Sequence, residues 1–315
     1  MKTWHALALL ALIACGGSDT DATDTSDTAD TTDTTGGGTS QNANPLSTPP
    51  TGSLTCFAPQ ATYETTTWLT QTLAEGLAGT TKSLVGTATD FEEETAEDNR
   101  EITMWFDDAI DATPDFFQEV GDDGTVTFDA PVCQPISYLA APVPGLEDAK
   151  PTYKVHQIYG PNTTEAEFIS VSSDSYNVIP AILGITPDPT KSIIAGTAFD
   201  CTRSPDTLSE IDDGKMENVQ IRVRNLDGTE PAGVAVRYFI ENFPDRDQPD
   251  TSPDGLFVAI NVPPGDMRVE MWGLVDGEEK ILGTSVIKSE ANSINITNLF
   301  AGFDSVKFPD SCVTP

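Results

Sequence analysis

Strict alternation of apolar and polar side chains, interrupted by turn residues, is the feature of this sequence that most constrains its fold. In the run VQIRVRN, Val219, Ile221 and Val223 fall on one face and polar residues on the other. That period of two is typical of a β-strand with one buried face. Comparable short runs follow, beginning at Val234, Leu256, Arg268, Lys280 and Ser293. Several short strands at this spacing predict an all-β sandwich rather than alternating strands and helices.

The two halves of the chain carry a weak internal repeat. KSLVGTATD, residues 82–90, matches KSIIAGTAFD, residues 191–200, with one inserted residue. Farther along, DDGTVTFDAPVCQP from Asp122 parallels SPDGLFVAINVPPG from Ser252, because each has a turn, an alternating strand and a proline-containing turn. We therefore predict two related modules, each long enough to build its own core.

The N-terminus has the pattern of an export signal. Lys2 precedes an apolar run that ends at Ala14, and this run is too short to span a bilayer. The last residues of the run, Leu-Ile-Ala followed by Cys15, resemble the bacterial lipobox. That resemblance implies a lipoprotein signal peptide at residues 1–14 and acylation of Cys15, for example with palmitate, so that the membrane is a partner through this lipid anchor. The alternative is an ordinary signal peptide with Cys15 unmodified.

Residues 15–53 are predicted to form a disordered, low-complexity acidic tether. Asp recurs near every third residue of its first part, Lys and Arg do not occur, and no large apolar residue appears before Leu46. Such a segment buries too little surface to offset its ordering entropy, and its charges repel one another. Gly16 follows the cysteine, which by resemblance to enteric sorting rules favours the outer membrane. We expect a lipid-anchored location in the bacterial cell envelope, with display at the cell surface.

The charge balance excludes one class of partner. The chain has 50 acidic and 16 basic residues, a net charge of −34. Binding of nucleic acid requires a basic surface that neutralises phosphates, so we expect no nucleic-acid partner.

Beyond Cys15 the chain has an even number of cysteines, Cys56, Cys133, Cys201 and Cys312. In an exported protein these are expected to form disulfides, and three connectivities are open. The modules are predicted at residues 54–186, which is the divergent copy, and 187–315. This division favours the pairs Cys56–Cys133 and Cys201–Cys312.

The second module carries a pattern of motifs that resembles a known family. Its first strand contains Gly196 and ends at Asp200, and the later turns contain Asp254-Gly255 and Asn261-x-Pro263-Pro264-Gly265. This pattern resembles the carboxypeptidase regulatory-like family, also called transthyretin-like or prealbumin-like. The resemblance implies a Greek-key-type β-sandwich, so the whole chain is expected to be all-β with two tandem sandwiches. Glycine supplies positive φ in such turns, and proline removes strand donors.

The sequence offers few groups for catalysis. His156 is the only histidine beyond the signal peptide, so a zinc peptidase site with two histidines is excluded. No Gly-x-Ser-x-Gly elbow presents a serine to it, and no phosphate-binding glycine loop occurs. We expect no cofactor. One acidic loop, with Asp245, Asp247, Asp250 and Asp254, has the carboxylate density of a calcium site, which is a weaker expectation because its spacing departs from known calcium loops.

These features predict that the protein is not an enzyme. The preferred hypothesis is a membrane-anchored, surface-displayed lipoprotein that acts as a structural spacer or as a binding or adhesion module. An alternative is an accessory lipoprotein that binds carbohydrate or peptide for a larger envelope complex; paired aromatic residues such as Trp105-Phe106, Phe116-Phe117 and Tyr238-Phe239 would then line a groove. A third hypothesis is a carboxylate- or calcium-dependent hydrolase. The protein or carbohydrate ligand is not specified by the sequence.

Overall fold

The computed structural model describes residues 41, 42, 44–92, 94–205 and 214–314. Nearly all regular structure in this part of the chain is β, which confirms the all-β prediction. The signal peptide, Cys15 and the tether up to residue 40 lie outside the described residues. No helix in the described ranges is both long enough and apolar enough to cross a membrane.

The chain forms short strands joined by tight turns, with one α-helix among the described elements. The strands are β1 Thr81–Asp90, β2 Arg100–Trp105, β3 Phe116–Glu119, β4 Thr125–Pro131, β5 Pro135–Pro142, β6 Ala149–Lys150, β7 Thr152–Ile158, β8 Glu165–Ser172, β9 Ser192–Phe199, β10 Val219–Asn225, β11 Ala235–Ile240, β12 Phe243–Asp245, β13 Leu256–Val262, β14 Gly265–Val275, β15 Glu278–Ser289, β16 Ile294–Ile296 and β17 Leu299–Phe300. The helix is α1, Ser173–Ile182, and 3₁₀ turns lie at Tyr63–Thr65 and Asp310–Cys312.

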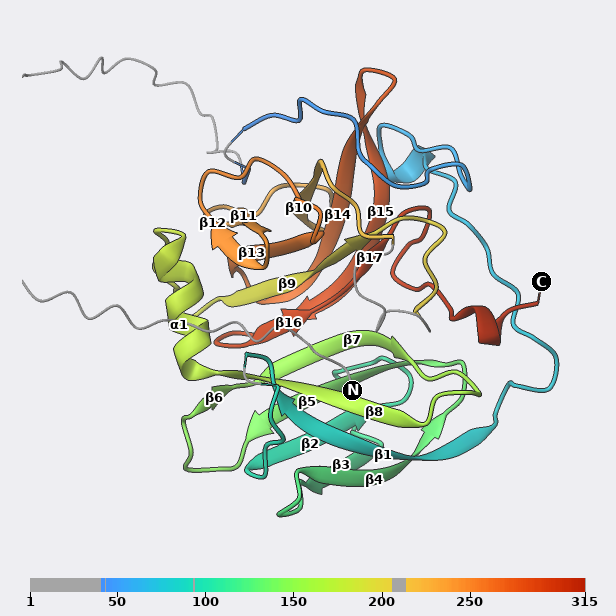
Figure 1. The fold of residues 1–315 in the computed structure, drawn as a ribbon, viewed down its shortest axis with the longest axis vertical. Coiled ribbons are helices and arrows are strands. Elements are labelled where there is room, and N and C mark those ends of the chain that lie inside the picture. The colour runs from blue at the N-terminus through green and yellow to red at the C-terminus, as the bar shows by residue number, and fades with distance from the viewer. Residues whose placement is uncertain (1–40, 43, 93, 206–213, 315) are drawn as a thin grey trace, which may run out of the picture. The chain divides into compact units, whose positions relative to one another are not determined.

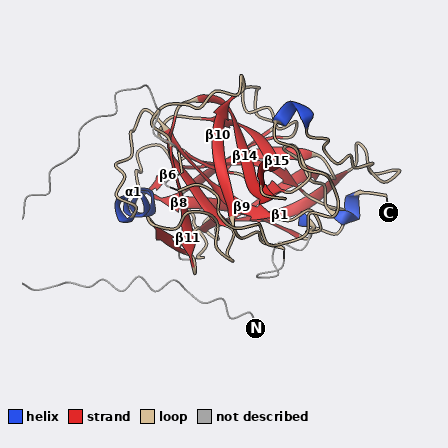
Figure 2. Ribbon diagram, turned by 90° about the horizontal axis from the view of Figure 1, so that it is seen from above, coloured by secondary structure: helices blue, strands red, loops and turns tan. Residues whose placement is uncertain are grey.

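The strands make three sheets, one of which runs through both halves of the chain (Figure 1). The first half has a small sheet with the order β4-β1-β8-β6, and the second half has one with the order β10-β14-β15. The ten-stranded sheet has the order β12-β11-β13-β9-β16-β7-β5-β2-β3, with β17 paired to β9. Figure 2 shows the stacked strands from above, with α1 at their periphery.

Each half has its own apolar core. In the first half, residues of β1, β2, β4, β5 and β8 form a cluster that includes Leu84, Ile102, Phe128, Tyr138 and Phe168. In the second half, residues of β9, β10, β13 and β14 form a larger cluster that includes Ile194, Ile221, Phe257 and Val269. The alternating side chains of the strands therefore fill two sandwich interiors, as their period of two predicts.

The internal repeat corresponds to equivalent strand pairs. β1 pairs antiparallel with β4, and Gly86 faces Val126. β9 pairs antiparallel with β13, and Gly196 faces Phe257. Val126 and Phe257 each lie two residues after the glycine of the preceding turn. The matched sequences thus occupy the same register in the two halves.

The two copies of the repeat have the same spacing, but their equivalent strand pairs lie in different sheets. β1 and β4 belong to the small sheet of the first half, whereas β9 and β13 belong to the ten-stranded sheet. The joint between the halves is β16, which pairs in parallel with β7 through Asn295↔Tyr153 and with β9 through Asn295↔Ile194. One sheet therefore supplies a layer to both sandwiches.

The turn predicted at Asp254-Gly255 is present and explains two motif residues. Asp254 accepts a hydrogen bond from the backbone N–H of Leu256 at 3.0 Å, and Gly255 has φ +65°. Gly196 is required by a close approach, because a Cβ at this position would collide with the carbonyl group of Thr297. Asp254 and Gly255 therefore serve the turn, and Gly196 allows the close approach of the backbone at Thr297.

The predicted disulfide pairs are wrong. The structure joins Cys56 to Cys201 and Cys133 to Cys312, with Cα atoms 6.2 and 5.5 Å apart. The prediction assumed that each cysteine pairs within its own half.

The actual pairing follows from the way the chain ends cross over. Residues near Cys56 pack on the second half, since Leu54 and Phe57 contact its core. The C-terminal segment returns to the first half, where Cys312 lies with Val132 and Ile158. Each disulfide therefore links the two halves. Leu54 and Phe57 were expected to belong to the first module, but they pack on the core of the second half.

We predict that peptide mapping without reductant will recover Cys56–Cys201 and Cys133–Cys312. Replacing Cys133 with Ser and Cys312 with Ser together should lower the free energy of unfolding by about 2–5 kcal/mol, because a loop of 179 residues is no longer closed. Equilibrium denaturation checks the loss, with the reduced wild-type chain as the control. Recovery of Cys56–Cys133 would contradict the assignment.

Candidate functional site

The end of the expected tether is bound to the sandwich rather than disordered. Residues 41–56, here called the strap, run along β10 and end at the disulfide to Cys201; residue 43 within it is not described. Gln41, Asn42 and Leu46 in the strap are buried. The predicted disordered segment of residues 15–53 is therefore too long at its C-terminal end, because these polar side chains have specific partners.

Gln41 acts as a substitute strand neighbour for β10. Its side-chain amide donates to the carbonyl of Val223 at 2.7 Å and accepts from the N–H of the same residue at 2.7 Å. Its backbone carbonyl accepts from the N–H of Val236 on β11 at 2.9 Å. β10 lies at the edge of its sheet and β11 belongs to the ten-stranded sheet, so Gln41 closes the open side between the two layers.

Asn42 likewise bonds to the backbone of β10, two residues before the residue that Gln41 contacts. Its amide donates to the carbonyl of Ile221 at 2.9 Å and accepts from the hydroxyl of Tyr238 at 2.5 Å. That hydroxyl accepts in turn from the N–H of Ile221 at 2.8 Å. Burial raises the pKa of Tyr238 well beyond its ordinary range, so the phenol keeps its proton and donates to Asn42.

The rest of the strap is attached by one or two hydrogen bonds at a time and then by a covalent bond. Asn218 donates to the carbonyl of Pro49 at 3.2 Å, and the N–H of Thr51 donates to the carbonyl of Glu217 at 3.2 Å. The N–H of Ser53 donates to a carboxylate oxygen of Asp200 at 3.0 Å. Cys56 follows three residues later and is covalently attached to Cys201.

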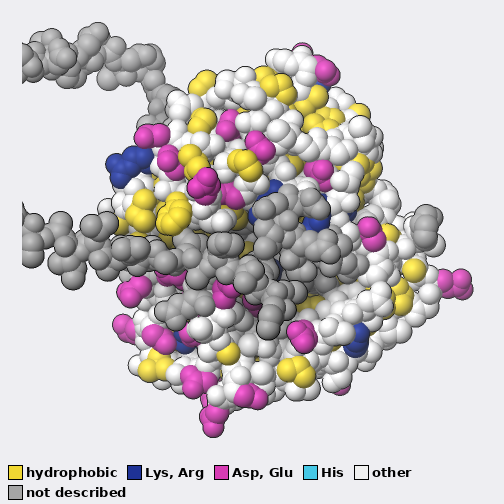
Figure 3. Space-filling model, in the orientation of Figure 1, with side chains coloured by type: hydrophobic (Ala, Val, Ile, Leu, Met, Phe, Trp, Pro, Cys, Tyr) yellow, Lys and Arg dark blue, Asp and Glu magenta, His cyan; other side chains and the backbone are white. Residues whose placement is uncertain are grey.

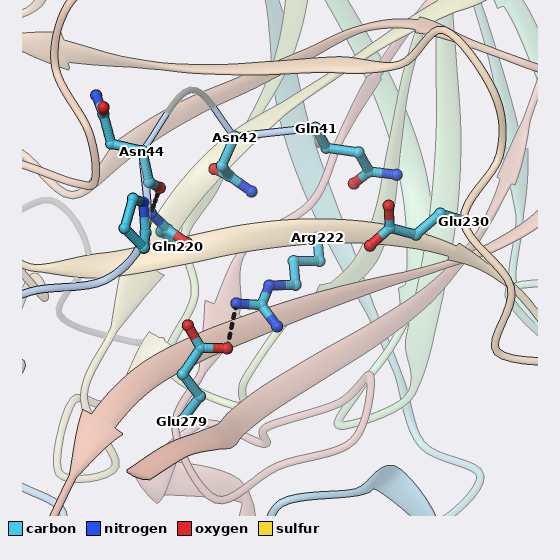
Figure 4. Close-up of a pocket in the computed structure, with 8 residues that line it drawn as sticks. Gln41, Asn42, Asn44, Gln220, Arg222, Glu230 and Glu279 are labelled. Atoms are coloured by element: carbon cyan, nitrogen blue, oxygen red, sulfur yellow. Dashed lines mark hydrogen bonds and ion pairs between the residues drawn. The ribbon is translucent and has the colours of Figure 1, made fainter. Parts of the chain in front are cut away.

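A groove of about 420 Å³ lies where the strap meets β10 (Figure 4). Its lining combines four amide residues and Pro45 with Arg222 and two glutamates; the residues are Gln41, Asn42, Asn44, Pro45, Gln220, Arg222, Glu230 and Glu279. Gln220 donates both to the carbonyl of Asn44 at 2.6 Å and to that of Pro249 at 3.0 Å. Most amide groups here are thus engaged within the chain.

The charged groups of the groove are also paired. Arg222 donates to Glu279 at 2.7 Å and stacks over the ring of Trp272, 4.3 Å from its centroid. Arg224 is 2.9 Å from Glu230. Glu230 and Glu279 are each paired with an arginine, so the groove offers no free carboxylate pair for acid–base chemistry. Arg222 covers one face of Trp272, so that face is not open to a sugar ring.

The paired aromatic residues do not line one platform. Trp105 and Tyr238 are buried, while Phe117 is 59 % exposed. Another exposed phenylalanine, Phe243, lies on β12, and Phe117 lies on β3, so these two rings are at opposite ends of the ten-stranded sheet. The face in Figure 3 shows acidic side chains spread widely, with apolar atoms in small groups among them.

His156 is brought together with Asp108 and Ser137. The Nδ1 atom of His156 contacts a carboxylate oxygen of Asp108, and Nε2 lies 2.9 Å from the carbonyl oxygen of Val286 on β15. Ser137 donates its hydroxyl to the other carboxylate oxygen of Asp108. Burial acts to raise the pKa of Asp108, but the hydrogen bonds from His156 and Ser137 outweigh it and lower the pKa below the ordinary value.

These three side chains are connected in an order that does not support nucleophilic catalysis. A hydrolytic triad requires the serine hydroxyl to donate to the histidine, which the carboxylate then orients. Here Ser137 donates to Asp108, and the far nitrogen of His156 faces a backbone carbonyl. The group instead connects β5 and β7 of the first half to β15 of the second.

The four aspartates of the candidate calcium loop do not converge, so that interpretation is wrong. No group of three or more His, Cys, Asp or Glu side chains in the described part of the chain is placed to hold a metal ion. Asp245 accepts from the N–H groups of Asp247 and Gln248, at 2.7 and 3.0 Å. Asp254 accepts from backbone N–H groups with both oxygens, and Asp250 is buried, which raises its pKa. The carboxylates of Asp245 and Asp254 stabilise turns.

A smaller cavity between the halves is lined in part by the buried side chain of Lys307. Lys307 donates to the carbonyl groups of Cys201 and Arg203, and its ammonium lies over the rings of Phe300 and Phe303 at 5.6 and 5.5 Å. Burial lowers the pKa of Lys307 to about 8. This side chain holds the C-terminal segment against the turn that carries the Cys201 disulfide.

Comparison with known proteins places this chain in no family. No protein-family model and no curated protein matches it. Among solved structures, the TIE protein of Bacillus anthracis is 11 % identical, with a TM-score of 0.20, over 72 % of this chain and 34 % of the other. The shaft pilin SpaA of Lactobacillus rhamnosus GG is 10 % identical, with a TM-score of 0.23, over 70 % and 98 %. The minor pilin GBS52 of Streptococcus agalactiae is 9 % identical, with a TM-score of 0.21, over 74 % and 98 %.

We predict that Gln41→Ala will lower the free energy of unfolding by about 2 kcal/mol, because it leaves the buried N–H and carbonyl of Val223 without partners. Asn44→Ala is the matched control. Only the backbone of Asn44 bonds to Gln220, and its side chain points away from the groove (Figure 4), so a change below about 0.5 kcal/mol is expected. Denaturant titration measures both. Equal effects of the two variants would contradict the role given to Gln41.

Lys307 should make stability depend on pH in the alkaline range. Its folded pKa of about 8 lies below its ordinary value of 10.5, so between these values the unfolded chain binds more protons than the folded chain. Stability from this group therefore rises as pH increases from 8 to 10.5, by about 1–2 kcal/mol after solvent screening. Lys307→Met should remove this rise, measured as the difference between variant and wild-type stability. A constant difference across the window would refute it.

Proposed function

We propose that this protein is a non-enzymatic lipoprotein of the cell envelope, anchored through Cys15 and displayed at the surface. An acidic tether holds its β-sandwich body away from the membrane, where the body acts as a spacer or adhesion module. The observation that carries the proposal is the strap. The fold devotes buried amide side chains and the disulfide Cys56–Cys201 to securing the segment that leads to the tether.

The attachment of the strap to the second half suits a folded domain that is held through its N-terminal end. A flexible linker that only joined a leader to an enzyme would need no contacts with the fold. Here Gln41 and Asn42 occupy the edge of β10, and the chain is then fixed covalently fifteen residues after Gln41. The same contacts protect an edge strand that would otherwise be open to pairing with other chains.

The polar groups of the body support a structural role over a chemical one. The amides of the groove and the group formed by Ser137, Asp108 and His156 are bonded to the chain itself. Many acidic side chains on the surface keep such a body soluble and favour repulsion between copies. The lipid attachment itself rests on the sequence around Cys15 and on the short apolar run that precedes it.

Metabolic labelling with palmitate tests the anchor. The wild-type protein should take up label and sediment with membranes, whereas Cys15→Ser should take up none and appear in the soluble fraction, because the acyl chains supply the membrane affinity. Protease treatment of intact cells then tests surface display, with an internal protein as the control for lysis. An unlabelled wild-type chain, or a body protected from protease in intact cells, would overturn the anchoring or the display respectively.

A further inference from the structure

We infer that the strap is a mechanical latch, which yields first under tension from the tether and is then stopped by the disulfide Cys56–Cys201. Its use in the cell rests on the proposed function, because tension reaches the strap only if the N-terminal end is anchored. The latch itself depends on three features of the described chain. These are the contacts of Gln41 and Asn42, the separate contacts of residues 44–54, and the position of the disulfide.

The first contacts of the described strap are hydrogen bonds made by buried side chains. Among the described residues, a pull from the N-terminal side reaches Gln41 first, and this residue makes three hydrogen bonds to two different strands. Asn42 adds bonds to Ile221 and Tyr238. Both side chains are buried, so water does not compete for these bonds until the side chains move out together. They therefore break as a unit.

The contacts that remain once these two residues are displaced lie at separate points along the strap. The carbonyls of Asn44 and Pro49 accept one hydrogen bond each, and Thr51 exchanges two with Glu217. Ser53 bonds to Asp200 and to the N–H of Cys201, Leu46 is buried, and Leu54 packs on the core. Under tension these contacts are loaded one or two at a time. A net value of about 1 kcal/mol for each such bond is small beside the stability of the sandwich core. The strap is thus expected to peel before either sandwich unfolds.

The disulfide ends the peeling at a defined length. Fifteen residues, from Gln41 to Thr55, precede Cys56, and a fully extended chain of this length spans about 50 Å. Beyond this point the load passes directly from Cys56 to Cys201. A load taken up by the second sandwich then bypasses residues 57–200, whereas a load taken up at the C-terminus is shared with residues 57–133, because Cys133 is joined to Cys312.

The other disulfide is a second covalent connection between the two halves. Cys133–Cys312 joins the end of β4 to the C-terminal segment, and its loop overlaps the one closed by Cys56–Cys201. Both Cys133 and Cys312 are buried, whereas Cys56 is exposed. A mild reductant should therefore open the stop while the buried disulfide persists, since thiol exchange requires access to the sulfur.

Single-molecule pulling with optical tweezers tests the latch. One handle is attached to the free thiol of Cys15 in an unacylated chain and the other to a tag after the C-terminus. The oxidised wild-type chain should show an early event with a contour gain below about 50 Å, before the body unfolds. After mild reduction the gain should exceed this limit, because peeling continues past residue 56.

Two variants separate the latch from general loss of stability. Gln41→Ala combined with Asn42→Ala should lower the force of the early event by about twofold and leave the later unfolding force unchanged, whereas Asn44→Ala should alter neither. Cys56→Ser with Cys201→Ser should reproduce the reduced chain; if that variant does not fold, the reduced wild type provides the same comparison.

The latch is refuted if no event precedes unfolding of the body, if its length is the same with and without the disulfide, or if the amide variants keep the wild-type force. These outcomes are independent of acylation, because the measurement uses no membrane. A chain that fails to take up palmitate would overturn the proposed anchor and leave the latch intact. A chain that takes up palmitate but shows no early event under tension would keep the anchor and overturn the latch.

Discussion

The parallel pairing of β16 with both β7 and β9 is the interaction on which the rest of the structure depends. Three residues, Ile294 to Ile296, hydrogen-bond to one strand from each half and so merge two sheets into one. Because that sheet is continuous across the joint, segments from one end of the chain can pack on the other half. The crossed disulfides and the contacts of His156 with Val286 both require this placement.

Edge protection is a second theme of the fold. β10 would expose its backbone groups at the edge of the small sheet, and the strap satisfies several of them with side-chain amides. β12, at one end of the large sheet, is three residues long and contains Pro244, which cannot donate to a neighbouring strand. The same contacts that protect β10 hold Gln41 and Asn42 against the second half, so a single segment both covers the strand edge and fixes the start of the described chain.

Local features of the fold could be predicted from the sequence because they depend on neighbouring residues. The alternation of Val219, Ile221 and Val223 marks β10, and the pair Asp254-Gly255 marks the turn before β13, since side-chain period and backbone φ are set locally. The repeat likewise identified two equivalent strand pairs. The strap could not be found in this way. Gln41 and Asn42 stand in a polar run, and only the partners supplied by β10 make them buried residues.

The sequence by itself determined the all-β class, the turns, the acidic charge and the presence of an even set of cysteines. Tertiary structure alone decided how the cysteines pair, because Cys56 and Cys312 lie on segments that cross to the opposite half. It also decided that Asp245 and Asp254 cap turns and that the four aspartates of this loop do not converge as a metal site would require. Both outcomes depend on distances between residues far apart in the chain, which strand periodicity and turn chemistry do not encode.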